Sequence, residues 1–110
     1  MIEARFGLPA STIESIHRVL ARHPQVEKAI IYGSRAKGNF RPGSDIDLTL
    51  SGSGLDSRQL GIIAEELDDL LLPYQIDLSI LAQIDHAPLR EHIERVGQEF
   101  YLPTLPLKRT

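Results

Sequence analysis

The sequence of 110 residues contains no cysteine and no tryptophan, and only 5% of its residues are aromatic. The absence of cysteine excludes disulfide bonds, thiolate metal sites and a cysteine nucleophile together. The sequence also lacks an apolar run long enough to span a membrane, and it has no basic and apolar leader. We therefore expect a cytoplasmic protein that makes no contact with a membrane.

The sequence is slightly acidic, with a formal net charge of −3 and a pI near 5.7. Broad binding of nucleic acid needs a basic face that displaces counterions, so no direct contact with nucleic acid is expected. A few local cations would still suffice to bind a nucleotide. The length and the apolar fraction of 42% predict one globular domain over residues 1–110.

Hydrophobic periodicity predicts an alternation of helices and strands. A capping box at Ser11-Thr12-Ile13-Glu14 is expected to begin a helix that ends near residue 23, before Pro24. A mostly apolar strand at 26–32 precedes a loop at 33–44 that holds at most a short helix. The further elements expected are a strand at 45–51, a helix capped by Asp56 that carries Leu60, Ile63, Leu67, Leu70 and Leu71, a strand at 74–81, a helix at about 86–101 and a loose tail at 102–110.

Two aspartates stand two residues apart on the strand expected at 45–51. Asp45 and Asp47 leave the same face, roughly 7 Å apart at Cα, and like charges this close repel unless a cation or proton intervenes. Asp77 lies on the polar face of the strand at 74–81, so the three carboxylates would converge if the two strands are neighbours. Oxygen ligands suit Mg²⁺ or Mn²⁺, and such a triad can hold two metal ions about 4 Å apart. The alternative is that these are ordinary solvent-facing residues, although aspartate is disfavoured inside strands.

A glycine-serine pair stands where the strand at 26–32 ends. Gly33 permits a tight turn and a close backbone approach, and the Ser34 hydroxyl adds a hydrogen-bond donor. Arg35, Lys37 and Arg41 add positive charge beside the two aspartates. A polar connecting loop would explain the glycines equally well, but it explains the gathering of three cations less well.

Three segments carry a resemblance to a known family: Gly33-Ser34-Arg35-Ala36-Lys37-Gly38, Ser44-Asp45-Ile46-Asp47-Leu48 and Gln75-Ile76-Asp77-Leu78. With these motifs the chain resembles the minimal nucleotidyltransferases of the polymerase-beta-type superfamily. The resemblance covers roughly residues 10 to 100, and it implies an α/β (α+β) fold with a core at about 10–101. Its sheet would be mixed and flanked by helices.

The resemblance also implies roles for individual residues. Asp45 and Asp47 would hold the Mg²⁺ of a bound nucleotide and share a second Mg²⁺ with Asp77, where an acceptor hydroxyl is deprotonated. The residues implied in nucleotide binding are Gly33, Ser34 and Arg35 at the β- and γ-phosphates, with Lys37, Arg41 and Ser44 as helpers.

Minimal members of this family often accompany a small all-helical protein of the HEPN type. In such a pair the nucleotidyltransferase is the antitoxin, and it transfers AMP from ATP to a tyrosine of its RNA-cleaving partner. The resemblance thus implies ATP or another nucleoside triphosphate as substrate, a HEPN-type partner, and a homo- or hetero-oligomer. Two alternatives stay open: nucleotidyl transfer to a small-molecule hydroxyl, and a non-catalytic nucleotide-binding scaffold that blocks its partner by binding.

Overall fold

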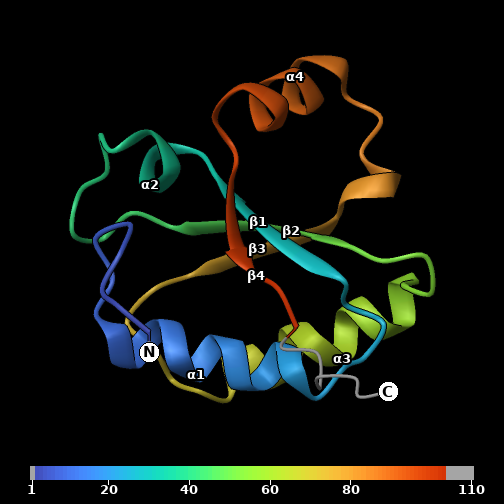
Figure 1. Ribbon diagram of the computed structural model, residues 1–110, viewed down its shortest axis with the longest axis horizontal. Coiled ribbons are helices and arrows are strands. Elements are labelled where there is room, and N and C mark those ends of the chain that lie inside the picture. Colours follow the sequence, from blue (N-terminus) through green and yellow to red (C-terminus); the bar gives the residue numbers. More distant parts are fainter. Residues whose placement is uncertain (1, 104–110) are drawn as a thin grey trace, which may run out of the picture.

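The computed structural model describes residues 2–103, and the elements within this range run from Ala10 to Tyr101 (Figure 1). In chain order they are α1 (Ala10–Ala21), β1 (Lys28–Tyr32), α2 (Ser34–Lys37), β2 (Ile46–Ser51), α3 (Ser57–Asp68), β3 (Ile76–Ile80), the 3₁₀ turn η1 (Leu81–Gln83), α4 (Ala87–Val96) and β4 (Gln98–Tyr101).

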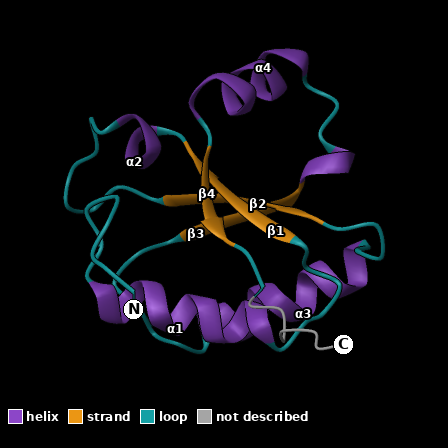
Figure 2. Cartoon of the chain, in the orientation of Figure 1, coloured by secondary structure: helices purple, strands orange, loops and turns teal. Residues whose placement is uncertain are grey.

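The strands form one four-stranded sheet in the order β3-β2-β1-β4. The pair β2–β3 is parallel, whereas β1 runs antiparallel to both β2 and β4, so the sheet is mixed. Helices α1 and α3 lie against one face, and α4 lies on the other side of the sheet (Figures 1 and 2). This architecture confirms the predicted mixed sheet with flanking helices.

The core lies between the sheet and the pair α1–α3. The alternating residues Ile46, Leu48 and Leu50 of β2 are completely buried there, as the period of two predicts. On the opposite face Thr49 is also completely buried, and its hydroxyl accepts a hydrogen bond of 2.9 Å from Ser79 on β3. The sheet therefore has an apolar face toward α1 and α3 and a polar face toward α4.

The predicted start of the first helix is wrong. Helix α1 begins at Ala10 with Pro9 as its N-cap, and no side chain caps it, so Ser11 lies inside the first turn. The carbonyl of Pro9 accepts the N–H groups of Thr12 and Ile13 at 3.1 and 3.2 Å. Because the buried Leu8 holds the preceding segment in the core, tertiary packing and not a capping box sets this start.

The predicted helix at 86–101 is also wrong in its second half. Helix α4 ends at Val96, and the chain then becomes β4, which pairs with β1. Phe100, expected on a helical stripe, is a buried strand residue. Pairing with the edge of β1 satisfies the backbone hydrogen bonds that a longer helix would have satisfied locally.

Smaller differences concern the ends of elements. Asp56 caps α3 as predicted, with its carboxylate accepting the Gln59 N–H at 2.8 Å. Leu71, however, lies beyond α3 and is 87% exposed. Most of the tail predicted at 102–110 lies outside the described residues. Between residues 2 and 103, no helix has both the length and the apolar character needed to cross a membrane.

Candidate active site

Three polar side chains form a row across the polar face, near the end of the sheet where β1 ends and β2 and β3 begin. Tyr32 of β1 is the register partner of Asp47 on β2, and Asp47 is in turn the register partner of Asp77 on β3. Register partners on neighbouring strands lie on the same face of a sheet. The prediction that the strands of Asp47 and Asp77 are neighbours is therefore confirmed.

This row holds two like charges in a partly buried place. The pKa of Asp47 is raised to about 6, first by burial and then by the charges of Asp77 and Asp45 and a hydrogen bond with Asp77. Burial is also the largest cause of a raised pKa at Tyr32, whose ring stands beside the two carboxylates. The row thus favours a proton or a cation between Asp47 and Asp77.

Asp45 is placed differently from the other two. It is exposed and precedes the first residue of β2. Over residues 2–103, no group of three or more histidine, aspartate or glutamate side chains is arranged so that it could hold a metal ion. Asp47 and Asp77 are therefore paired, and Asp45 lies near enough for its charge to act on Asp47, but the three carboxylates do not converge into one metal-holding group in the described residues.

The Gly33 turn lies directly against this pair. Gly33 has a φ of 76°, which favours glycine, and a Cβ at this position would collide with Oδ2 of Asp47. Its N–H donates a hydrogen bond of 3.2 Å to Nε2 of His92 on α4. The ring of His92 also packs edge-on against Tyr32, with 6.1 Å between centroids. The turn is thus fixed between a carboxylate of β2 and a histidine of α4.

Neither His92 nor the position of Tyr32 was found from the sequence. His92 belongs to no motif, and its contact with Gly33 joins residues 59 positions apart. The one available signal was the place of His92 beside the buried Ile93 on an amphipathic helix. That signal indicates which side of α4 faces the protein, but it does not identify Gly33 as the partner of His92.

Arg35 does not face the site, so its expected contact with phosphates is not supported by its position. Its side chain is 2% exposed and is surrounded by the rings of Phe40 and Tyr74, 5.2 and 5.0 Å from the guanidinium carbon. The guanidinium donates hydrogen bonds to the carbonyl oxygens of Phe6 (2.9 Å), Gly7 (3.4 Å), Pro42 (3.2 Å) and Ser44 (2.9 and 3.1 Å). Arg35 therefore ties the loop at 33–44 to the segment before α1.

The other predicted nucleotide contacts lie around this loop. Ser34, at the start of α2, is half-buried, whereas Lys37 and Arg41 are exposed. The Ser44 hydroxyl accepts the N–H of Arg41 at 2.8 Å, so it shapes the loop. Ser34, Lys37 and Arg41 remain accessible to a ligand.

Comparison with known proteins identifies the fold. Residues 14–103 match the family described as polymerase beta, nucleotidyltransferase. None of the curated protein sequences compared with the chain matches it.

Solved structures of toxin–antitoxin pairs share this fold. One contains AMP-PNP, with 22% identity and a TM-score of 0.67 over 84% of this chain and 73% of that one. A second is the MntA–HepT pair, with 20% identity and a TM-score of 0.62 over 86% and 72%. A third is a tri-AMPylated HEPN toxin of Shewanella oneidensis in complex with its MNT antitoxin, with 20% identity and a TM-score of 0.63 over 86% and 71%.

The family match spans the glycine-serine turn, both strands that carry the paired aspartates, and α4 with His92. The chain belongs to the polymerase beta nucleotidyltransferase family, as its three sequence motifs predicted.

Proposed function

We propose that the chain is a Mg²⁺-dependent adenylyltransferase that transfers AMP from ATP to a tyrosine hydroxyl of a HEPN-type partner and thereby acts as an antitoxin. The observation that carries the proposal is the register pair Asp47–Asp77 beside the Gly33 turn, in a chain of this family. The catalytic core is proposed to be residues 10–101.

The residues present fit a divalent cation. Asp47 and Asp77 supply hard oxygen ligands from neighbouring strands, and the raised pKa of Asp47 reflects first its burial and then the repulsion from Asp77 and Asp45, both of which a cation would offset. Asp45 is exposed and two residues away from Asp47, so its side chain can turn toward the pair once that repulsion is offset. Asp45, Asp47 and Asp77 are therefore the proposed ligands of two Mg²⁺ ions, with Mn²⁺ as a substitute, and bound metal would neutralise charge that develops on the phosphates.

The accessible residues of the loop are the proposed nucleotide contacts. The Gly33 N–H already has His92 as its acceptor, so Gly33 would serve by leaving room beside Asp47. The half-buried Ser34 would donate its hydroxyl to the phosphates, and the exposed Lys37 and Arg41 would add positive charge. Ser44 would act indirectly, through the loop conformation that its hydroxyl stabilises.

In the proposed reaction, the oxygen of the acceptor hydroxyl attacks the α-phosphorus of ATP. A bond forms between that oxygen and phosphorus, and the bond from the α-phosphorus to the bridging oxygen breaks. Pyrophosphate leaves with the electron pair of the broken bond. The hydroxyl proton would pass to the carboxylate of Asp77, which is exposed at the outer end of the row, and from there to solvent.

Two solved relatives support the choice of nucleotide and partner. One toxin–antitoxin structure holds AMP-PNP, and another contains a tri-AMPylated HEPN toxin beside its antitoxin. The acidic balance of this chain also suits docking on a basic, RNA-binding partner.

Intact-mass measurement of the acceptor tests the proposal. A HEPN-type protein is incubated with ATP, Mg²⁺ and the parent chain, and in a separate reaction with ATP, Mg²⁺ and the variant Asp45→Asn/Asp47→Asn. A gain of one or more AMP units, about 329 Da each, is expected with the parent and is expected to be absent with the variant. Glu91→Gln/Glu94→Gln, which removes two exposed carboxylates of α4, is the matched control and should transfer as the parent does.

The other possible outcomes are informative. A stable complex with no mass gain for any of the four nucleotides contradicts the proposal and supports a scaffold that blocks its partner by binding. A mass gain that persists in Asp45→Asn/Asp47→Asn would show that the transfer does not depend on the proposed metal site.

A further inference from the structure

Strand β3 forms an outer edge of the sheet. Among residues 2–103 it pairs with β2 alone. The N–H of Ile46 donates a hydrogen bond of 2.9 Å to the carbonyl of Gln75. This bond fixes which residues of β3 point their backbone N–H and C=O groups toward β2 and which point them away. The N–H and C=O groups of Ile76 and Leu78 point away from β2. An unpaired row of backbone groups of this kind can pair with a further strand.

A groove of about 930 Å³ lies beside this edge, between β3 and α3. Its floor includes Leu67, Leu72, Ile76 and Leu78, of which the last three are only half-buried. Glu65 and Asp68 of α3 supply the charged part of its lining. Over the described lining the groove is therefore apolar and acidic, which suits a segment that carries apolar and basic side chains.

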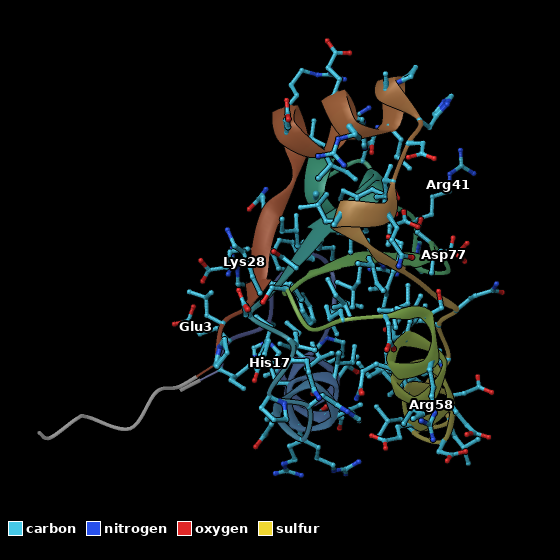
Figure 3. The ribbon with its side chains drawn as sticks, turned by 90° about the vertical axis from the view of Figure 1, so that its right-hand side faces the viewer. Glu3, His17, Lys28, Arg41, Arg58 and Asp77 are labelled. Carbon is cyan, nitrogen blue, oxygen red and sulfur yellow. The ribbon has the colours of Figure 1, made fainter. Side chains whose placement is uncertain are left out.

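The same edge carries Asp77 on its other face. Because side chains alternate along a strand, Ile76 and Leu78 face the groove while Asp77 faces the candidate active site. Figure 3 shows Asp77 at the flank of the molecule, between α4 above and α3 below. A strand added to β3 would place alternate side chains in the groove and beside Asp77. A residue opposite Asp77 would have its Cβ about 5 Å from that of Asp77.

We propose that the acceptor protein presents its hydroxyl on an extended segment that pairs with the free edge of β3. Basic and apolar side chains of that segment occupy the groove, and the hydroxyl side chain on its other face lies beside Asp77. The inference rests on the proposed function and deepens it, because it states how this chain recognises an acceptor without a separate recognition domain. Pairing with the backbone selects an extended conformation, and Glu65 and Asp68 select positive charge.

Charge reversal in the groove tests the inference. In Glu65→Lys/Asp68→Lys, the KM for the HEPN-type acceptor should rise about tenfold or more, because like charges now face the basic segment. The KM for ATP should stay within about twofold, since neither residue faces the nucleotide side. The matched control, Glu91→Lys/Glu94→Lys on α4, changes the net charge by the same amount and should leave both KM values near those of the parent. Ala64→Arg, which fills the groove from an exposed helix position, should reproduce the acceptor effect.

Hydrogen exchange provides the second readout and separates this inference from the proposed function. Addition of the acceptor protein to the parent chain should protect the amides of Ile76 and Leu78. Unprotected amides in a formed complex, or an unchanged KM for the acceptor in Glu65→Lys/Asp68→Lys, overturn the inference while AMP transfer by the parent still supports the proposed function. Protection of these amides by the acceptor without AMP transfer would support the proposed docking on β3 and contradict the proposed adenylyltransferase function. Protection that grows with the concentration of the chain alone would assign the edge to a second copy and overturn the inference.

Discussion

At the scale of single residues, Gly33 combines two constraints that only glycine meets together. Its backbone has a positive φ, and its missing side chain leaves room for the carboxylate of Asp47. Gly38, at the other end of α2, has a φ of 89° but has nothing within 4 Å of an added Cβ. The two glycines therefore share a backbone constraint and differ in the contact with the site.

This difference predicts unequal effects of two alanine substitutions. Gly38→Ala should lose about 1 kcal/mol of stability through its left-handed backbone, and Gly33→Ala should lose more, because its φ of 76° with a ψ of −155° is a conformation almost confined to glycine. Only Gly33→Ala should also lower kcat, by about a hundredfold, because the added methyl group displaces Asp47. Urea unfolding and steady-state kinetics of both variants check this. Equal kcat values in the two variants would contradict a role of the close approach.

His92 predicts a second effect at the residue scale. In His92→Leu the Gly33 N–H loses its acceptor, so the stability should fall by about 1 kcal/mol and the KM for ATP should rise several-fold as the turn loosens. His92→Gln keeps an acceptor atom and should restore most of both losses. His86, an exposed histidine at the start of the same helix, provides the control in His86→Leu. Parent-like kinetics in His92→Leu would show that the contact does not serve the reaction.

At the scale of elements, the loop between α2 and β2 depends on the buried Arg35. Its guanidinium donates hydrogen bonds to the carbonyl of Phe6, before α1, and to the carbonyls of Pro42 and Ser44, after α2. These carbonyls would otherwise lack a partner. A side chain of similar length without donors leaves these partly buried carbonyl oxygens without the donor they have in the parent.

Stability measurements distinguish this role from phosphate binding. Arg35→Met should reduce the free energy of unfolding by about 3 kcal/mol, whereas Lys37→Met, in the exposed last position of α2, should change it by less than about 0.5 kcal/mol. The KM for ATP should show the opposite order of effects: it should rise in Lys37→Met and change less in Arg35→Met. Denaturant unfolding and kinetics of the pair check both parts, and a fully stable Arg35→Met with weak ATP binding would restore Arg35 as a phosphate ligand.

The contact between α1 and β4 predicts a dependence of stability on pH. The Nε2 of His17 donates a hydrogen bond of 2.7 Å to the carbonyl of Phe100, and burial lowers the pKa of His17 below its ordinary value of 6.5, partly offset by this bond. The unfolded chain therefore binds more protons than the folded one between the lowered pKa and 6.5. Stability should be full above pH 6.5 and should fall as the pH drops below it.

Unfolding by urea at pH values from 7.5 to 5 measures this slope. In His17→Gln, which keeps a donor but does not titrate, the slope over that window should be smaller than in the parent. An identical slope in the two proteins would assign the acid sensitivity to other groups.

At the scale of the whole molecule, the paired carboxylates oppose folding until a cation arrives. Because the raised pKa of Asp47 means that its charged form is disfavoured in the fold, Asp47→Asn should be more stable than the parent at neutral pH without metal. Ligand that binds only the folded chain adds stability by mass action. At about 100 times its Kd, Mg²⁺ with ATP should add about 2.7 kcal/mol to the parent, or roughly 10–20 °C in Tm.

Thermal unfolding with and without Mg²⁺ and ATP checks this prediction. The parent should show the upward shift and Asp47→Asn should not, although the variant starts from the higher Tm. Chelation of the metal should return the parent to its starting value. A shift of equal size in Asp47→Asn would place the binding site elsewhere.

The features that follow from local backbone geometry were predictable from the amino-acid sequence alone. Alternation with a period of two placed Ile46 and Leu48 on the core face and Asp47 on the other, and a period near 3.6 indicated α1 and α3. The spacing of the glycine-serine pair and the aspartates identified the family that the comparison with known proteins confirmed. These features could be predicted because each depends on residues close together in the chain.

The contacts between groups far apart in the chain follow from tertiary packing. It buried Arg35 against the segment before α1, joined His92 to the Gly33 turn, and made residues 98–101 a strand instead of the end of a helix. It also left the β3 edge beside an acidic groove, with Asp77 on the opposite face. The physical reason is that burial, strand pairing and hydrogen-bond partners depend on packing between distant segments, which no local period or motif spacing contains.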